Sequence, residues 1–187
     1  MNMRTLLFAV LVMVMACNKK NIPFNETRQD DLYLVAGKVY YSKYFSQNIS
    51  LEAAQKELTK DNFPASGIQV KSVTDKKLNG IILSMPMEWH TFIGDKIQAS
   101  EQMKKPLNAT FEIEKTDSGY KVTVQNIWFS NDWEHTHQEN VVLEKYILND
   151  KGFAFRSDNN TLRIIKHLCN RFDSLFDLNA SFGSSKF

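Results

Sequence analysis

Apolar and polar residues alternate over much of the chain between residues 32 and 148, and this pattern predicts strands. The clearest case runs from Phe111 to Val124, where a period of two is interrupted by turn residues at 117–119. Such a pattern predicts a β-hairpin with one buried face. Further segments rich in β-branched and aromatic residues predict additional strands. These are Leu34 to Tyr44, a hairpin of 68–73 and 81–85 with its turn at 76–80, and Val141 to Leu148.

Two other segments have the three- and four-residue spacing of amphipathic helices. The longer one runs from Thr161 to Leu178. The shorter one covers Leu51 to Leu58, with Ser50 placed to cap its first turn. A helix near each end of a mainly antiparallel meander predicts an α+β fold, with a sheet of about five to seven strands and both helices packed on one face.

Within this region three stretches stand out, namely the segment 77–83 with Asn79 and Gly80, the run 110–114 and the segment 119–127. Their order and composition resemble an uncharacterised domain family found in envelope proteins of Bacteroidota. The resemblance covers residues 32–178 and implies a TATA-binding-protein-like fold. It implies no activity and defines no functional residues, and the name of the fold does not imply DNA binding.

The N-terminus follows a different pattern, in which Arg4 precedes an unbroken apolar run from Leu6 to Ala16. This layout predicts an export signal, because the run is shorter than the roughly 20 residues that a membrane-spanning helix needs. Residues 14–17 resemble a bacterial lipobox, which implies fatty acyl chains such as palmitate on Cys17. Acyl chains would anchor the protein without spanning the membrane. A plain secretory signal, with no role for Cys17, stays open as the alternative.

These patterns divide the chain into four parts. They are a lipoprotein signal peptide at 1–16, a lipidated cysteine with a polar tether at 17–31, a single α+β domain at 32–178 and a flexible tail at 179–187. Removal of the signal leaves 171 residues, the usual size of one domain. Cys169 lies on the apolar face of the last predicted helix, so we expect a buried structural thiol there.

The net charge of +2 gives no electrostatic reason to expect binding to nucleic acid. We expect instead a protein of the bacterial cell envelope that contacts the membrane through lipid on Cys17. The residues after Cys17 are Asn18, Lys19 and Lys20, and none of them is acidic. They therefore do not resemble surface-export signals, which favours an orientation toward the periplasm. Another envelope protein is the expected macromolecular partner.

The densest polar cluster runs from Asp132 to Glu139. His135 and His137 are two residues apart, so both could face one side of an extended segment and share a zinc ion, with His90 or Glu139 as a third ligand. A lone His-x-His is more often a solvated loop, and we predict neither a metal site nor another cofactor. No catalytic residue is assigned, because the chain lacks Gly-x-Ser-x-Gly, His-Glu-x-x-His and a phosphate-binding glycine loop. A metal-dependent enzyme remains the least favoured alternative.

Tryptophan is enriched at the centres of protein interfaces, which makes Trp89 and Trp133 the candidate binding residues. Trp128 and Phe129 are expected in the core instead. The leading hypothesis is therefore a non-catalytic module that binds or scaffolds another protein. The alternative from a different class is a binder of a small apolar ligand between sheet and helix. The stretch 88–106 shows no clear period, and the sequence identifies neither partner nor ligand.

Overall fold

The computed structural model describes residues 27–60, 67–89, 97–131 and 141–178. In these ranges the chain forms a seven-stranded antiparallel sheet in the order β1-β2-β3-β7-β6-β5-β4, together with three helices. The strands are β1 (Thr27–Gln29), β2 (Leu32–Val35), β3 (Lys38–Phe45), β4 (Ile68–Val73), β5 (Lys77–Met85), β6 (Leu107–Thr116) and β7 (Gly119–Phe129), and the helices are α2 (Leu51–Leu58), α3 (Glu144–Ile147) and α4 (Asn159–Phe176). The predicted α+β class and the mainly antiparallel sheet are confirmed.

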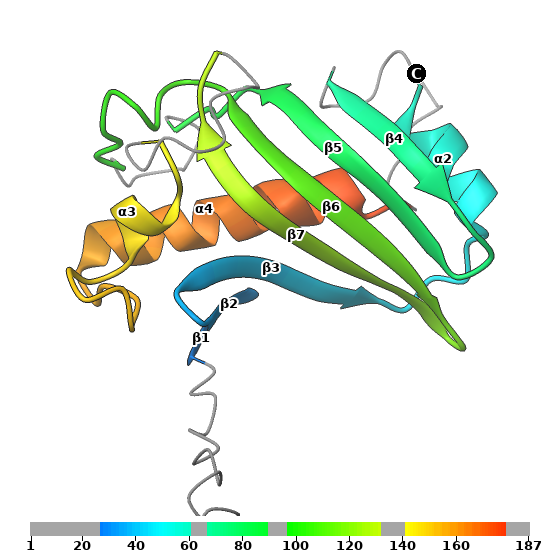
Figure 1. The fold of residues 1–187 in the computed structure, drawn as a ribbon, viewed down its shortest axis with the longest axis horizontal. Coiled ribbons are helices and arrows are strands. Elements are labelled where there is room, and N and C mark those ends of the chain that lie inside the picture. Colours follow the sequence, from blue (N-terminus) through cyan, green and yellow to red (C-terminus); the bar gives the residue numbers. More distant parts are fainter. Residues whose placement is uncertain (1–26, 61–66, 90–96, 132–140, 179–187) are drawn as a thin grey trace, which may run out of the picture.

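The long helix α4 crosses one face of the sheet, and α2 lies beside β4 and β5 at the end of the same layer (Figure 1). Both helices begin at a capping side chain. Asp158 accepts a hydrogen bond from the Thr161 amide at 2.9 Å, and Ser50 accepts one from the Ala53 amide at 3.1 Å. Each cap satisfies an amide that the first turn of a helix leaves without an internal partner. The predicted cap at Ser50 is thus confirmed.

Aromatic rings fill the layer between the sheet and α4. Phe111 on β6 packs against Phe176 with ring centroids 5.2 Å apart, and Tyr41 on β3 packs against Phe172 at 5.1 Å. All four side chains are at most 2% exposed. Burial of such large rings dominates the energetics of a core of this size.

The turn predicted at 76–80 is wrong, because β5 begins at Lys77 and contains Gly80. The ring of Phe111 packs directly over Gly80, where an added Cβ would lie 2.4 Å from the Phe111 Cζ. The glycine therefore serves close packing within a strand rather than a change in chain direction.

The segment from Leu34 to Tyr44 forms parts of two strands instead of the single strand predicted. Ala36 and Gly37 join β2 to β3 with φ of 50° and 76°. Two successive residues in the left-handed region are typical of a two-residue hairpin loop. The turn was not predicted because alanine, rather than glycine or asparagine, occupies its first position.

Residues 141–148 contain α3 rather than the predicted strand. β3 pairs with β7 only over Tyr41–Phe45, so the amide of Val39 lies beyond that pairing. The Glu144 carboxylate of α3 accepts a hydrogen bond from this amide at 3.1 Å. α3 thus supplies a partner where β3 and β7 no longer pair, which is a tertiary effect that local periodicity does not report.

The predicted signal peptide, Cys17 and the tail at 179–187 lie outside the described residues. β1 begins at Thr27, within the segment 17–31 that is predicted to be a tether. In the described ranges, no helix is both long and apolar enough to cross a membrane.

Candidate functional site

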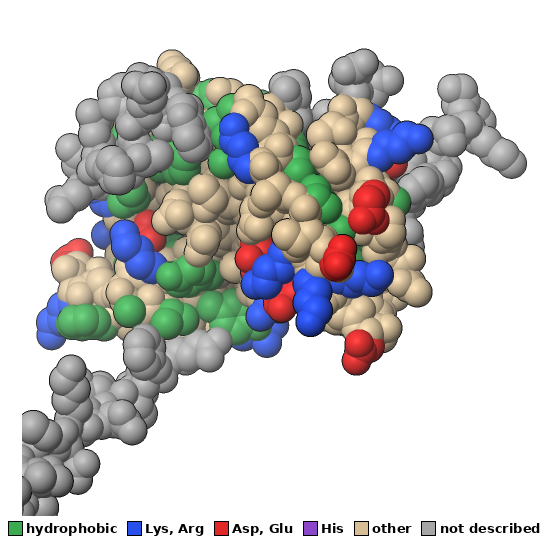
Figure 2. Space-filling model, turned by 45° about the vertical axis from the view of Figure 1, so that its right-hand side comes forward, with side chains coloured by type: hydrophobic (Ala, Val, Ile, Leu, Met, Phe, Trp, Pro, Cys, Tyr) green, Lys and Arg blue, Asp and Glu red, His purple; other side chains and the backbone are tan. Residues whose placement is uncertain are grey.

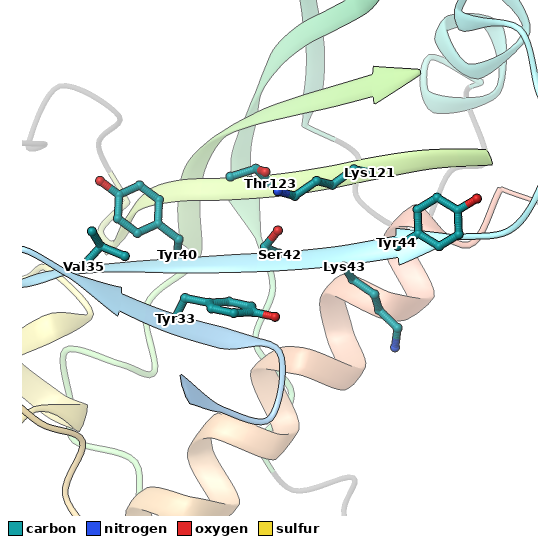
Figure 3. A pocket seen from close by; sticks show the side chains of 8 residues that line it. All are labelled: Tyr33, Val35, Tyr40, Ser42, Lys43, Tyr44, Lys121 and Thr123. Atoms are coloured by element: carbon teal, nitrogen blue, oxygen red, sulfur yellow. The ribbon is translucent and has the colours of Figure 1, made fainter. Parts of the chain in front are cut away.

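The face of the sheet opposite α4 has no helix over it in the described part of the chain (Figure 1). Over β2, β3 and β7 it contains a depression of about 420 Å³. Figure 3 shows the side chains that line it. They are Tyr33, Val35, Tyr40, Ser42, Lys43, Tyr44, Lys121 and Thr123.

Strand register brings these side chains together from distant parts of the sequence. Ser42 on β3 lies opposite Thr123 on β7, and Tyr40 lies opposite Tyr33 on β2. Paired residues project to the same face of a sheet, and alternate residues of a strand do so too. The three tyrosines of the depression therefore share the open face, and Tyr44 is 47% exposed there.

Five polar side chains of the depression make no hydrogen bond or ion pair with described residues. They are the hydroxyl groups of Tyr33, Tyr40, Ser42 and Thr123 and the ammonium group of Lys121. The end of the Lys121 side chain lies beside Thr123 in Figure 3. A bound molecule would find donors and acceptors here without breaking an internal contact of the described domain.

Lys43 borders the depression, but its side chain turns away toward α4 (Figure 3). Its Nζ lies 2.5 Å from Oδ2 of Asp173 and 3.3 Å from Oδ2 of Asp31. Burial lowers the pKa of Lys43, but hydrogen bonds and attraction from these two carboxylates outweigh burial and raise the pKa overall. Lys43 is therefore held by ion pairs within the domain, and Lys121 is the cation available to a bound molecule among the described lining residues.

Elsewhere on the open face, many polar side chains pair with one another. Lys77 on β5 forms an ion pair with Glu112 on β6 at 2.9 Å, and the Asn79 amide donates to the Ser72 hydroxyl at 3.2 Å. Figure 2 shows positive and negative side chains intermingled at the lower right of the visible surface, below a broad uncharged polar area. The half of the face formed by β2, β3 and β7 is thus the better candidate for recognition.

The lining residues can bind, but they do not form a catalytic set. Neither histidine nor cysteine nor a carboxylate lines the depression, so a nucleophile would have no described general base beside it. Among the residues that the structure describes, no cluster of three histidine, cysteine or carboxylate side chains could hold a metal ion. Tyrosine rings, hydroxyl groups and one amine favour recognition by packing and hydrogen bonding.

Of the residues singled out in the sequence, Cys17, His90, Trp133, His135 and His137 lie outside the described ranges. Their predicted roles stay predictions.

Trp89 is described and is only 3% exposed. Its indole Nε1 donates to the carbonyl oxygen of Met103 at 2.8 Å, and its ring packs near Phe129 and His167 with centroids 6.3 and 5.0 Å away. The side chain is therefore engaged in packing, and a role in binding a partner stays untested. Trp128, at 1% exposed, and Phe129 lie in the core as predicted.

Cys169 is buried on α4, as its place in the helical pattern predicts. Burial raises the pKa of its thiol to about 12, so the group is protonated at neutral pH. A protonated, buried thiol is a poor nucleophile.

The tyrosines of the depression were not among the site residues predicted from the sequence. Tyr40, Ser42 and Tyr44 alternate with the buried residues Val39 and Tyr41, and this alternation already divides β3 into two faces. It does not reveal which face a helix covers. The alternation along β3 was therefore visible in the sequence, but strand pairing and the position of α4 decide which of the two faces is open.

No known protein family matches the chain by its sequence profile, and no curated protein matches it either. Among solved structures, the fold is similar to a DUF4468 family protein from Bacteroides ovatus, with 15% sequence identity and a TM-score of 0.44. The similarity covers 83% of this chain and 92% of that one. At this identity and TM-score it carries no information about activity.

Proposed function

We propose that this chain is an exported bacterial envelope protein, anchored by lipid on Cys17 and facing the periplasm, whose domain binds another protein through the open face of its sheet. The export and the anchor are supported by Arg4, the apolar run from Leu6 to Ala16 and the lipobox-like residues 14–17. The resemblance to a family of Bacteroidota envelope proteins with a TATA-binding-protein-like fold agrees with this compartment.

The observation that carries the binding proposal is the depression over β2, β3 and β7, with its three tyrosines and its available polar groups. Tyrosine combines a large ring with a hydroxyl group and is enriched at the energetic centres of protein interfaces. A shallow surface of this kind suits a protein partner better than a fully enclosed small molecule. The layer between sheet and α4 is occupied by ring pairs such as Phe111 and Phe176, so we place binding on the outside of the sheet.

Site-specific photocrosslinking tests this proposal. A photoreactive phenylalanine analogue replaces Thr123 in the depression and, as a matched control, Lys166, which is exposed on α4 on the other side of the sheet. After irradiation of intact cells, we expect a discrete crosslinked protein from position 123 and none from position 166. Equal crosslinking from both positions, or none from position 123, would contradict binding through the open face.

A further inference from the structure

The loop between α3 and α4 holds a phenylalanine out into solvent. Phe153 is 77% exposed, the largest exposure among the large apolar residues of the described domain. The loop itself is well defined by hydrogen bonds. The Asn149 amide donates to the Ala154 carbonyl at 2.9 Å, and the Phe153 amide donates to the Asn149 side-chain oxygen at 3.1 Å. The ring is thus presented by an ordered turn and does not contribute to the core.

This loop lies next to the point where the N-terminal segment enters the domain. Thr27, the first residue of β1, pairs with Leu34 near the end of β2. The hairpin loop that follows β2 contains Gly37, and a Cβ built there would lie 3.9 Å from the carbonyl oxygen of Gly152. In Figure 1 the start of β1 and the loop before α4 both lie toward the lower left.

The distance from Cys17 to this end of the domain has an upper limit. Thr27 lies ten residue steps along the chain from Cys17, and even a fully extended chain of that length spans only about 35 Å. An acyl group on Cys17 would therefore hold this end of the domain close to a bilayer. The exposed ring of Phe153 belongs to the same end.

Basic side chains surround the loop. Lys38 and Lys151 are exposed and make no ion pair with described residues. Lys145 and Arg156 line a neighbouring depression of about 460 Å³, together with Gly37 and Gly152. An aromatic ring flanked by lysines is a combination that favours the interface of an anionic bilayer, with the ring among the acyl chains and the amines at the headgroups.

The carboxylates at this end have partners within the domain. Glu144 accepts the hydrogen bond from the Val39 amide at 3.1 Å, and Asp150 lies 3.8 Å from the guanidinium of Arg156. The charges left for an outside partner are therefore mainly positive.

We infer that this loop is a membrane-contact site, in which Phe153 enters the bilayer interface and Lys38 and Lys151 face anionic lipid headgroups. The inference rests on the proposed lipid anchor and adds an orientation to it, because one defined end of the domain then faces the membrane.

The test uses the full-length lipidated protein, reconstituted into vesicles of phosphatidylcholine and phosphatidylglycerol. A dye sensitive to polarity is attached at Phe153→Cys and, as a control, at Glu101→Cys, whose native side chain is 87% exposed and lies in the segment between β5 and β6. We expect nitroxide-labelled lipids to quench the dye at position 153 about twofold or more over the dye at position 101, since only the former reaches the interface. The intact mass of the same samples reports whether Cys17 carries lipid.

Equal quenching at both positions in protein that carries lipid would overturn the membrane contact and leave the anchor intact. Absence of lipid on Cys17 would overturn the anchor, and the inference would fall with it. Greater quenching at position 153 in vesicles that contain phosphatidylglycerol than in pure phosphatidylcholine would support the role of the lysines.

Discussion

Replacement of Tyr41 by phenylalanine should destabilise the domain measurably. Its ring is fully buried against Phe172, and its hydroxyl group donates to Oδ1 of Asp173 at 2.6 Å. The same carboxylate binds Lys43 through Oδ2. The substitution keeps the ring and removes one of the two hydrogen bonds that Asp173 on α4 accepts from β3.

The magnitude follows from the charge and burial of the partners. A hydrogen bond to a charged group contributes about 1.5–3 kcal/mol, and Asp173 keeps Lys43 as a partner in the variant, so we expect a loss of about 2 kcal/mol. For a chain of this size that corresponds to a decrease in Tm of about 4–8 °C. Lys43→Met should cost less than about 1 kcal/mol, because the Lys43 and Asp173 side chains are 32% and 30% exposed and such pairs are weak.

Urea denaturation followed by tryptophan fluorescence measures both variants. The midpoint should shift while the slope stays constant, which indicates a change in stability rather than in compactness. A Tyr41→Phe variant within about 0.5 kcal/mol of the parent, or a larger cost for Lys43→Met than for Tyr41→Phe, would show that the Tyr41 hydroxyl does not stabilise the domain in this way.

Four further predictions follow from the described contacts. Gly80→Ala should lose about 1–3 kcal/mol in the same assay, because its Cβ would lie 2.4 Å from the Phe111 ring; an unchanged midpoint would contradict this. Ala36→Asn should gain about 0.5–1 kcal/mol, because φ at this position is 50° and asparagine tolerates the left-handed region; a loss would show that another constraint dominates. Burial raises the pKa of Cys169 to about 12, so its thiol should resist Ellman's reagent in native protein and react in urea; rapid native labelling of a Cys17→Ala variant would count against burial. Burial and, to a smaller extent, the charge of a nearby arginine lower the pKa of His167 below its usual 6.5. As the pH decreases through 6.5, the unfolded chain therefore binds this proton before the folded one does, and the free energy of unfolding should fall. His167→Gln should flatten this part of the plot of stability against pH, and an unchanged plot would contradict the prediction.

Elements whose formation depends on local pattern could be predicted from the sequence. α4 shows a sustained helical period with Asp158 as its cap, and the hairpin of β6 and β7 shows strict alternation around a short turn. In both cases neighbouring residues supply the burial pattern and the terminating signal. The α+β class follows from these two elements and the shorter helix α2.

Features that depend on partners far away in the chain could not be predicted. The sequence around Glu144 predicts a strand, yet the segment is helical. Its Glu144 carboxylate accepts a hydrogen bond from the Val39 amide, which lies beyond the pairing of β3 with β7. The candidate site has the same origin, because Ser42 and Thr123 meet only through the pairing of β3 with β7. Local alternation separates the two faces of a strand, whereas the open face is defined by the position of α4.

Attachment of the domain to a membrane through Cys17 is the claim on which the compartment, the class of partner and the orientation of the Phe153 loop all depend. The most direct test is intact-mass analysis of the protein isolated from cell membranes, compared with Cys17→Ala. We expect a mature chain that begins at Cys17 and carries two or three acyl chains, and we expect the variant to be lost from the membrane fraction. A mature chain without acyl groups in the soluble fraction would contradict this expectation.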